Sequence, residues 1–252
     1  MTIIETLLRE IPKYAEPALF NLYFAAVSLP IGFAFALLFA LGKTSKNPII
    51  RGLASAYVYA FRGSPLFIQF FMFYSIMLAL NAVWWRPMGI SWLMMNPLFI
   101  GPLALVMNTT AYTAEIIYGA LRTVPRGELE AARAYGMTPY QVFRTVTWPN
   151  TIRIAWPAYT NEVVFLFHAT ALVYFTLPVI DGQRDIMNTA RNFFERDYNA
   201  FLHFSVAALW FLAISMVIFF IFGLVYERLM RHMPKERTAS RPRLRFGPKY
   251  IR

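Results

Sequence analysis

Several polar side chains lie inside apolar stretches of this 252-residue chain, where their chemistry would be contact with a polar solute. Asn108, Tyr112 and Glu115 are spaced at i, i+4 and i+7, which places them on one stripe of a helix. A carboxylate at the centre of a bilayer costs at least about 2.5–3.5 kcal/mol on insertion scales, so such groups face a bundle interior or a watery cavity. The stripe is therefore a candidate lining for a solute pathway. An ion pair between Glu115 and Arg122, about two helical turns away, is the structural alternative.

A second polar stripe follows in a later apolar stretch. Asn161 and His168 are seven residues apart and share a helical face, which Glu162 adjoins. Structural alternatives exist here too, because Glu162 closely follows Arg153 and could lie at the interface, and the histidine and asparagines of both stripes could join helices by hydrogen bonds. An acid–base enzyme is disfavoured, because Glu162 and His168 lie about 120° apart on a helix, with no nucleophile or metal cluster beside them.

The composition is that of a membrane protein. Hydrophobic residues make up 58% of the chain and charged residues 15%, and the mean hydropathy is positive. The absence of cysteine excludes disulfides, thiol nucleophiles and cysteine-held zinc. His168, His203 and His232 fall in different segments without ligand-like spacing, so no metal site is expected.

Five apolar segments predict an all-α integral membrane protein with five transmembrane helices. The first carries no charge and exceeds the roughly 20 residues that cross a bilayer. The predicted spans are residues 17–42, 66–80, 97–121, 154–178 and 198–226.

The segments between the spans complete this prediction. Residues 1–16 are mixed in charge and lack the features of a signal peptide, so we expect them to be retained. An apolar patch at residues 53–61 is half a span long and would lie along the interface or begin the next helix. Residues 81–96 contain three tryptophans, which is typical of an aromatic belt at the membrane surface. Residues 181–197 are expected to form a polar loop.

The distribution of basic residues predicts the orientation. Of the 24 lysines and arginines, 18 lie in the segments 43–62, 122–153 and 228–252, and 6 lie in the alternate segments. By the positive-inside rule the N-terminal segment 1–16 is periplasmic and the C-terminus cytoplasmic. Since the basic residues follow one membrane face, nucleic acid is not an expected partner despite the net charge of +11. The basic cytoplasmic tail, residues 232–252, is expected to touch anionic lipid or a specific partner.

A polar insert between the third and fourth predicted spans is patterned as a helical hairpin. Gly127 is expected to end the preceding helix, and Glu128 and Glu130 fall in the first turn of the next one, where carboxylates favour the helix dipole. Gly136 can supply a left-handed C-cap. A second helix would begin with Thr138 as N-cap and Pro139 at its first position, and end at Pro149.

This insert resembles the EAA loop in the membrane subunits of bacterial ATP-binding-cassette importers. The resemblance rests on Glu130-Ala131-Ala132, on Gly136 four residues later, and on Val146-x-Trp148-Pro149, which departs from the usual Ile-x-Leu-Pro. It implies a type I importer permease fold over residues 17–231, with a coupling loop at 126–149 that docks in a cleft of the ATPase subunit. The residues it implies in ATPase coupling are Glu128, Glu130, Ala131, Ala132, Arg133 and Gly136.

Three further motifs resemble the polar amino-acid subgroup of these permeases. They are Arg62-Gly63-Ser64-Pro65 with Gln69, Ala111-Tyr112-Thr113-Ala114-Glu115, and Arg122-x-Val-Pro-x-Gly127. The stretch from Asn161 to Leu172 lacks the Lys-Asp pair of many members and is similar to permeases for histidine, lysine, arginine and ornithine and to their opine-transporting relatives. Keeping Glu162 without a fixed lysine suits a cationic solute.

The resemblance also implies the partners. They are ABC ATPase subunits that carry the ATP and Mg²⁺, so that this chain binds no cofactor, a periplasmic solute-binding protein that touches residues 81–96 and 179–200, and a second, similar permease subunit in a heterodimer. The complex would lie in the bacterial inner membrane, among its lipids. The alternative is an ATP-independent carrier or channel subunit, which would account for the polar stripes but would not need so patterned a hairpin.

Overall fold

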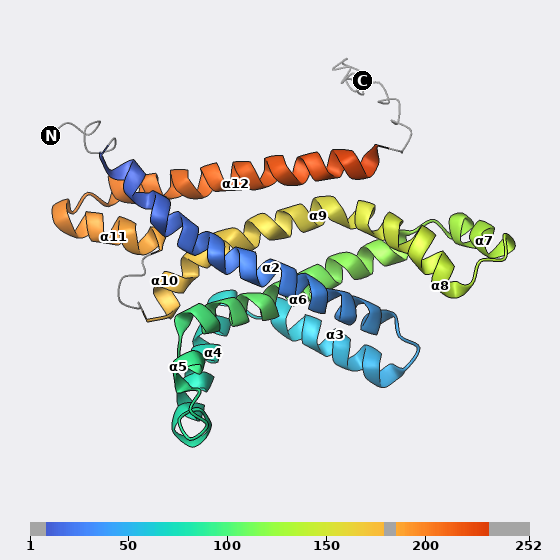
Figure 1. Cartoon of the computed structure of the whole chain (residues 1–252), viewed down its shortest axis with the longest axis horizontal. Helices are drawn as coiled ribbons and strands as arrows, with labels where there is room; N and C mark the ends of the chain where they lie inside the picture. The colour runs from blue at the N-terminus through green and yellow to red at the C-terminus, as the bar shows by residue number, and fades with distance from the viewer. Residues whose placement is uncertain (1–8, 179–184, 232–252) are drawn as a thin grey trace, which may run out of the picture.

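The computed structural model describes residues 9–178 and 185–231. The longest helices in these ranges are α2 (Ala15–Thr44), α6 (Pro97–Thr123), α9 (Trp148–Ala169) and α12 (Ala200–Met230). Figure 1 shows α12, α9 and α6 following one another from top to bottom, with α2 running diagonally across them. The predicted all-α architecture is confirmed.

Helices α2 and α6 form the most extensive helix pair, and glycines let them approach closely. A Cβ atom added at Gly32 would clash with the Thr109 side chain, and one added at Gly101 would clash with the Phe24 ring. Thr110 also donates a hydrogen bond to the backbone oxygen of Gly32 across 3.3 Å. Small residues are what allow membrane helices to pack backbone to backbone.

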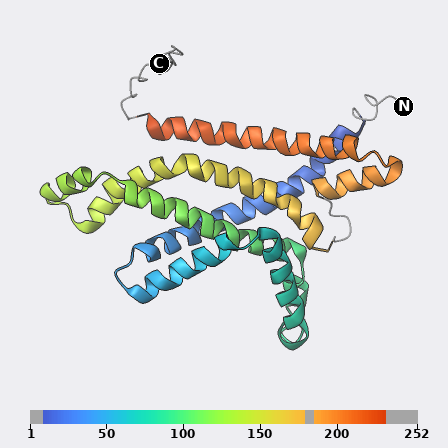
Figure 2. The ribbon, with the colours of Figure 1, turned by 180° about the vertical axis from the view of Figure 1, so that it is seen from behind.

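The apolar patch predicted at residues 53–61 belongs to a separate helix, α3 (Pro48–Gly63), which packs on α2 and α6. After a break at Ser64 and Pro65 the chain continues as α4 (Leu66–Leu80), the π-helical turn η2 (Asn81–Trp85) and the short α5 (Ser91–Met94). Figures 1 and 2 show α4 and α5 as a hairpin that projects away from the other helices.

The polar insert forms a helical hairpin, as predicted, but its first boundary differs. Helix α6 ends at Thr123 and α7 (Arg126–Ala134) follows at once, so the prediction that Gly127 ends the preceding helix is wrong, and this glycine lies inside α7. Pro125 is the N-cap and separates the two helices instead. Gly136 has a φ of 78°, which confirms the left-handed conformation expected of it.

The second helix of the hairpin, α8 (Pro139–Val142), begins as predicted. The Thr138 hydroxyl accepts from the Gln141 backbone N–H, and the Gln141 side chain accepts from the Thr138 backbone N–H, which completes a capping box. The predicted stop at Pro149 is wrong, because α8 continues through the π-helical turn η3 (Phe143–Thr147) into α9. Pro149 is the second residue of α9 and directly follows η3.

The polar loop predicted at residues 181–197 is helical in its described part. Helix α11 (Ile186–Asp197) has an apolar face that packs on α12 and on the start of α2. The Asp185 side chain caps it by accepting from the Asn188 backbone N–H across 2.6 Å. The buried cluster at this end of the molecule contains Tyr14, Ala18, Ile186, Ala190, Phe193, Val206 and Ala207.

Three of the described helices are long and apolar enough to cross a membrane by length and composition: Ile11–Thr44, Leu66–Trp85 and Ala200–Met230. Helices α6 and α9 are about 40 and 33 Å long at 1.5 Å per residue, enough for a bilayer, but their composition is more polar. The count of five spans therefore stays a prediction. The expected boundary between residues 16 and 17 falls inside a helix, and the tail 232–252 lies outside the described residues.

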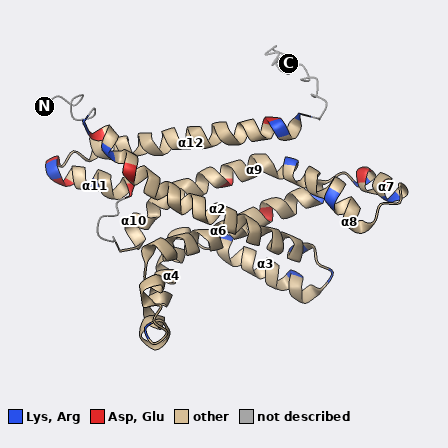
Figure 3. Cartoon of the chain, viewed as in Figure 1, with Lys and Arg blue, Asp and Glu red and all other residues tan. Residues whose placement is uncertain are grey.

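Charged residues gather toward the two ends of the long helices (Figure 3). The end that carries α7, α8 and the last turn of α12 is rich in arginine. A shallow pocket there is lined by Pro125, Glu128, Arg153 and Tyr226, among others, so the base of the hairpin and the end of α12 lie together. The opposite end, formed by α11 and the start of α2, carries both acidic and basic residues.

Candidate functional site

The polar stripe of α6 faces the break between α3 and α4. Asn108 Nδ2 donates to Gln69 Oε1 across 3.0 Å, and both side chains are buried. Gln69 Nε2 in turn donates to the backbone oxygens of Phe61, at 2.7 Å, and Ser64, at 3.0 Å. Backbone carbonyls freed by an interrupted helix are thus satisfied by a polar side chain inside the bundle, as membrane helices require.

Glu162 reaches the same level from α9. Its side chain is buried and accepts a hydrogen bond from Thr109 Oγ1 across 2.9 Å. Asn108 Oδ1, on the neighbouring residue of α6, is buried without a hydrogen-bond partner among the described residues. A buried carboxylate and an unpaired amide oxygen are acceptors, and together they favour a ligand that donates hydrogen bonds or carries positive charge.

Tyr112 and Glu115 continue the stripe toward the hairpin end. Glu115 forms an ion pair with Lys43 at the end of α2, and Arg62 Nη1 lies 3.6 Å from the same carboxylate oxygen. The Arg62 guanidinium also lies over the Tyr112 ring, 5.4 Å from its centroid. Glu115 is thus ion-paired, as the structural alternative expected, but with Lys43 rather than Arg122, whose guanidinium lies over the Tyr118 ring.

The polar residues of α9 do not line one common surface. Glu162 faces α6, whereas His168 Nε2 lies 2.7 Å from Ser215 Oγ on α12. His168 therefore joins two helices, which was the structural alternative for it. Asn161 is exposed on the single chain. The structure brings Asn108 and Glu162 together through the adjacent Thr109, and leaves Asn161 and His168 apart from them.

The hairpin formed by α7 and α8 is exposed at most of the residues that the sequence predicts to act in coupling. Glu128, Glu130, Ala131, Arg133 and Gly136 are exposed, and Ala132 packs inward with 5% of its surface exposed. Glu128 accepts a hydrogen bond from the Asn150 side chain in the first turn of α9, which ties the hairpin to that helix.

Sequence reasoning missed several partners of these side chains. Thr109, Lys43 and Ser215 bond to predicted site residues, and Gln69 entered only through a motif. Each contact joins helices far apart in the sequence, so helical spacing along one segment carries no signal for it. Thr109 is adjacent to Asn108 in the sequence. Threonine is common in helix interfaces, however, so its residue type alone does not mark it as part of a site.

Known proteins match nearly the whole chain. A family profile described as "Binding-protein-dependent transport system inner membrane component" matches residues 28–234. The chain is 38% identical over 222 residues to the histidine/lysine/arginine/ornithine transport system permease protein HisM of Escherichia coli, covering 86% of this chain and 89% of that protein. It is 35% identical over 215 residues to the nopaline transport system permease protein NocM of Agrobacterium fabrum, covering 85% and 87%.

Solved structures match the fold over the same length. A chain from "Crystal structure of an amino acid ABC transporter with histidines" superposes with a TM-score of 0.73 at 25% identity, covering 90% of this chain and 99% of that one. A chain of the MetNI methionine ABC transporter superposes with a TM-score of 0.59 at 20% identity, covering 91% and 99%. The structural matches confirm the predicted importer-permease fold. The family and the permease relatives confirm the transport role, so Glu162 and His168 are not the acid–base pair of an enzyme. The chain belongs to the family of inner membrane components of binding-protein-dependent transport systems.

Proposed function

We propose that this chain is the permease subunit of an ATP-driven importer that moves polar amino acids of the cationic or opine class from the periplasm to the cytoplasm. Family membership supports the transport role. The relatives described as permeases for histidine, lysine, arginine and ornithine and for nopaline support the solute class.

One observation carries the proposal: the hairpin joins the two helices that bear the polar side chains. Only Val124 and Pro125 separate α6 from α7, and α8 runs through η3 into α9. Glu128 also bonds to Asn150 of α9. A displacement of α7 would therefore move α6 with Asn108 and α9 with Glu162.

The exposed residues of α7 are the proposed contact with the ATPase. The ATPase subunits would bind the ATP and Mg²⁺, and this chain would hold no cofactor. Because a ligand shifts a conformational equilibrium only by its differential affinity, the ATPase must hold α7 differently in its nucleotide states. Ala132, which is buried in the last turn of α7, would transmit that movement to the rest of the hairpin.

The proposed orientation places the hairpin in the cytoplasm. The arginine-rich end of the helices carries the hairpin and the end of α12, which is what the positive-inside rule favours for a cytoplasmic face. The mixed-charge end at α11 would then face the periplasm and the solute-binding protein. A second permease subunit, a similar sister chain in a heterodimer, would complete the pathway.

Within the pathway the six predicted side chains take different parts. Asn108 and Glu162 offer buried acceptors for a cationic solute, and Tyr112 and Glu115 lie between them and the cytoplasmic mouth. Glu115 is engaged by Lys43, so its contact with a solute requires that ion pair to open. Asn161 is exposed on this chain, where the sister subunit could cover it, and His168 would position α9 against α12.

The coupling assignment is tested by reversing one exposed charge of α7. In the complex assembled with its ATPase subunits and binding protein, Glu130→Lys should lower solute-stimulated ATP hydrolysis by at least about tenfold, a loss of roughly 1.4 kcal/mol of coupling. Glu227→Lys, at an exposed glutamate of α12, is the matched control and should retain stimulation. Normal uptake with Glu130→Lys would contradict the coupling role. Failure of any ATPase to copurify with the wild type would favour the carrier alternative.

The orientation is tested separately by thiol labelling. Because the chain contains no cysteine, Arg133→Cys introduces its only thiol, at an exposed position of α7. In intact cells a membrane-impermeant maleimide should leave this thiol unlabelled, and it should label the thiol after the membrane is opened. Labelling in intact cells would place the hairpin outside and remove it from any cytoplasmic ATPase.

A further inference from the structure

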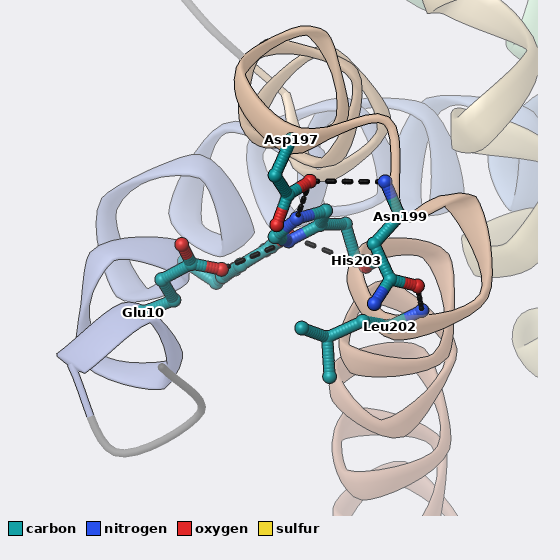
Figure 4. A network of polar contacts seen from close by, with 6 residues as sticks. Glu10, Asp197, Asn199, Leu202 and His203 are labelled. Carbon is teal, nitrogen blue, oxygen red and sulfur yellow. Dashed lines mark hydrogen bonds and ion pairs between the residues drawn. The ribbon is translucent and has the colours of Figure 1, made fainter. Parts of the chain in front are cut away.

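His203 lies between two carboxylates where the chain before α2 meets the corner of α11 and α12 (Figure 4). Its Nδ1 is 2.9 Å from Glu10 Oε2, and its Nε2 is 2.8 Å from Asp197 Oδ1. The side chains of His203 and Glu10 are 1% and 5% exposed, whereas that of Asp197 is 45% exposed. Glu10 lies far from the other two in the sequence, whereas Asp197 and His203 are six residues apart, on either side of the turn between α11 and α12.

This cluster needs an extra proton. A neutral imidazole has one N–H and one lone pair, so it can donate to only one of its two carboxylates. Glu10 Oε2 has no well-aligned hydrogen bond among the described residues, so its attraction to His203 rests on charge. A buried carboxylate that loses its only charged partner is strongly destabilising. A neutral ring between two ionised carboxylates is therefore one proton short. The extra proton sits either on the His203 ring or on the Glu10 carboxyl.

Other charged groups at this corner face elsewhere. Lys13 and Arg196 lie over the Phe193 ring, at 5.6 and 5.1 Å from its centroid, and neither forms an ion pair with Glu10. The Tyr14 hydroxyl donates to the backbone oxygen of His203 across 3.3 Å and does not bond to the ring nitrogens. The pKa of Asp197 is lowered, chiefly by a hydrogen bond from the Asn199 backbone N–H and next by His203, so this partner stays ionised in mild acid.

The cluster fastens a segment that few other polar contacts hold. Residues 9 and 10 are helical and lead into η1 (Ile11–Tyr14) ahead of α2, and Trp210 Nε1 donates to the Ile11 backbone oxygen across 3.1 Å. We propose that Glu10, His203 and Asp197 form a proton-dependent clamp that holds residues 9–14 against the α11–α12 corner and loosens when the extra proton leaves at alkaline pH. Exposed Asp197 gives that proton a route to water.

The clamp does not depend on the transport assignment. The proposed orientation does bear on its function. In that orientation this corner faces the periplasm, where pH follows the surroundings of the cell.

Distance measurement between two spin labels tests the clamp. Ile11→Cys and Phe201→Cys place the only thiols of the chain on the segment and on the first turn of α12, at positions 39% and 86% exposed. With the full chain in lipid nanodiscs, labelled once and then exchanged into buffers at about pH 5.5 and about pH 8.5, we expect one narrow distance at the lower pH. At the higher pH that population should fall by at least about half.

Two variants separate the clamp from general pH effects. Glu10→Gln removes the buried charge, and its amide can donate to or accept from a neutral ring, so the narrow distance should persist at both pH values. Glu16→Gln makes the same change at an exposed carboxylate of the next turn and should behave as the wild type. A narrow distance at both pH values in the wild type, or an equal pH shift in Glu10→Gln, would overturn the proposal.

Discussion

Thr109 of α6 donates a hydrogen bond to Glu162 of α9, with 2.9 Å between Oγ1 and Oε1. The residue before it, Asn108, donates to Gln69 of α4 across 3.0 Å. All four side chains are buried. Two adjacent positions of α6 therefore bond to two different helices, and the meeting of α4, α6 and α9 is fixed by polar groups as well as by packing.

Removing the Thr109 hydroxyl should destabilise the protein. Thr109→Val keeps the shape of the side chain but leaves the buried Glu162 carboxylate without this donor, which costs about 1–3 kcal/mol for an unsatisfied buried group. We expect a lower temperature of unfolding in detergent, measured by the fluorescence of the tryptophans. Thr109→Ser keeps the hydroxyl and should lie much closer to the wild type. Equal loss in both variants would show that the methyl group, rather than the hydrogen bond, matters here.

The sequence predicts those features of the site that depend on residues close together in the chain, and not those that depend on contacts between distant helices. Asn108, Tyr112 and Glu115 do share a face of α6, because helical spacing is a local property. The partners of that face, Gln69 and Lys43, come from other helices, and no spacing within α6 points to them. Polar stripes therefore indicated where a pathway could lie but not which helices close it.

The close approach of α2 and α6 gives a second prediction. Gly101→Ala would place a methyl group against the Phe24 ring, and overpacking of this kind costs typically about 1–3 kcal/mol. Gly223→Ala is the matched control, since a Cβ atom at this glycine of α12 meets nothing within 4 Å. There the substitution should be neutral or stabilise the helix by up to about 1 kcal/mol. Unfolding of both variants in detergent provides the comparison, and equal stabilities would mean that the Phe24 ring can move aside.

The turn between α7 and α8 gives a third prediction. Gly136→Ala forces an L residue into a φ of 78°, which costs about 1 kcal/mol or more, and should raise amide hydrogen exchange in residues 137–142 by roughly fivefold. Gly127→Ala lies in α7 and should leave exchange there unchanged or slower. Hydrogen-exchange mass spectrometry of the complex measures both. Unchanged exchange in Gly136→Ala would mean that the hairpin is held by its partner rather than by this turn.

Local signals predicted the caps of this hairpin but not its ends. Thr138, Pro139 and Gly136 act within a few residues of themselves, and the structure has each where the sequence placed it. The end predicted at Pro149 fails, because the chain stays helical from α8 through η3 and Pro149 into α9. Likewise the polar composition of residues 186–197 suggested a loop, although its few apolar residues share one buried face of α11.

The cap of α11 gives a prediction that depends on pH. Burial raises the pKa of the Asp185 carboxyl to about 6, against hydrogen bonds from the Asn188 and Met187 backbone N–H groups that lower it. The folded state then binds this proton more tightly than the unfolded state, so stability should fall as pH rises from about 4 to about 6 and stay lower above that. Asp185→Asn cannot ionise, yet asparagine caps helices equally well. Its free energy of unfolding should therefore exceed that of the wild type at about pH 8, by up to roughly 3 kcal/mol, and its unfolding temperature should be higher. Near about pH 4 the two proteins should be equally stable.

Comparison with Asp185→Ala separates the charge of this residue from its role as a cap. Alanine removes both, so it should lose about 1 kcal/mol relative to Asp185→Asn at every pH, while sharing its flat response between pH 4 and 6. Unfolding curves of the three proteins in one detergent over that range decide the matter. If Asp185→Asn were less stable than the wild type at about pH 8, the hydrogen bonds to the ionised carboxylate would outweigh the cost of burying it, and the pKa of Asp185 would have to lie below its ordinary value.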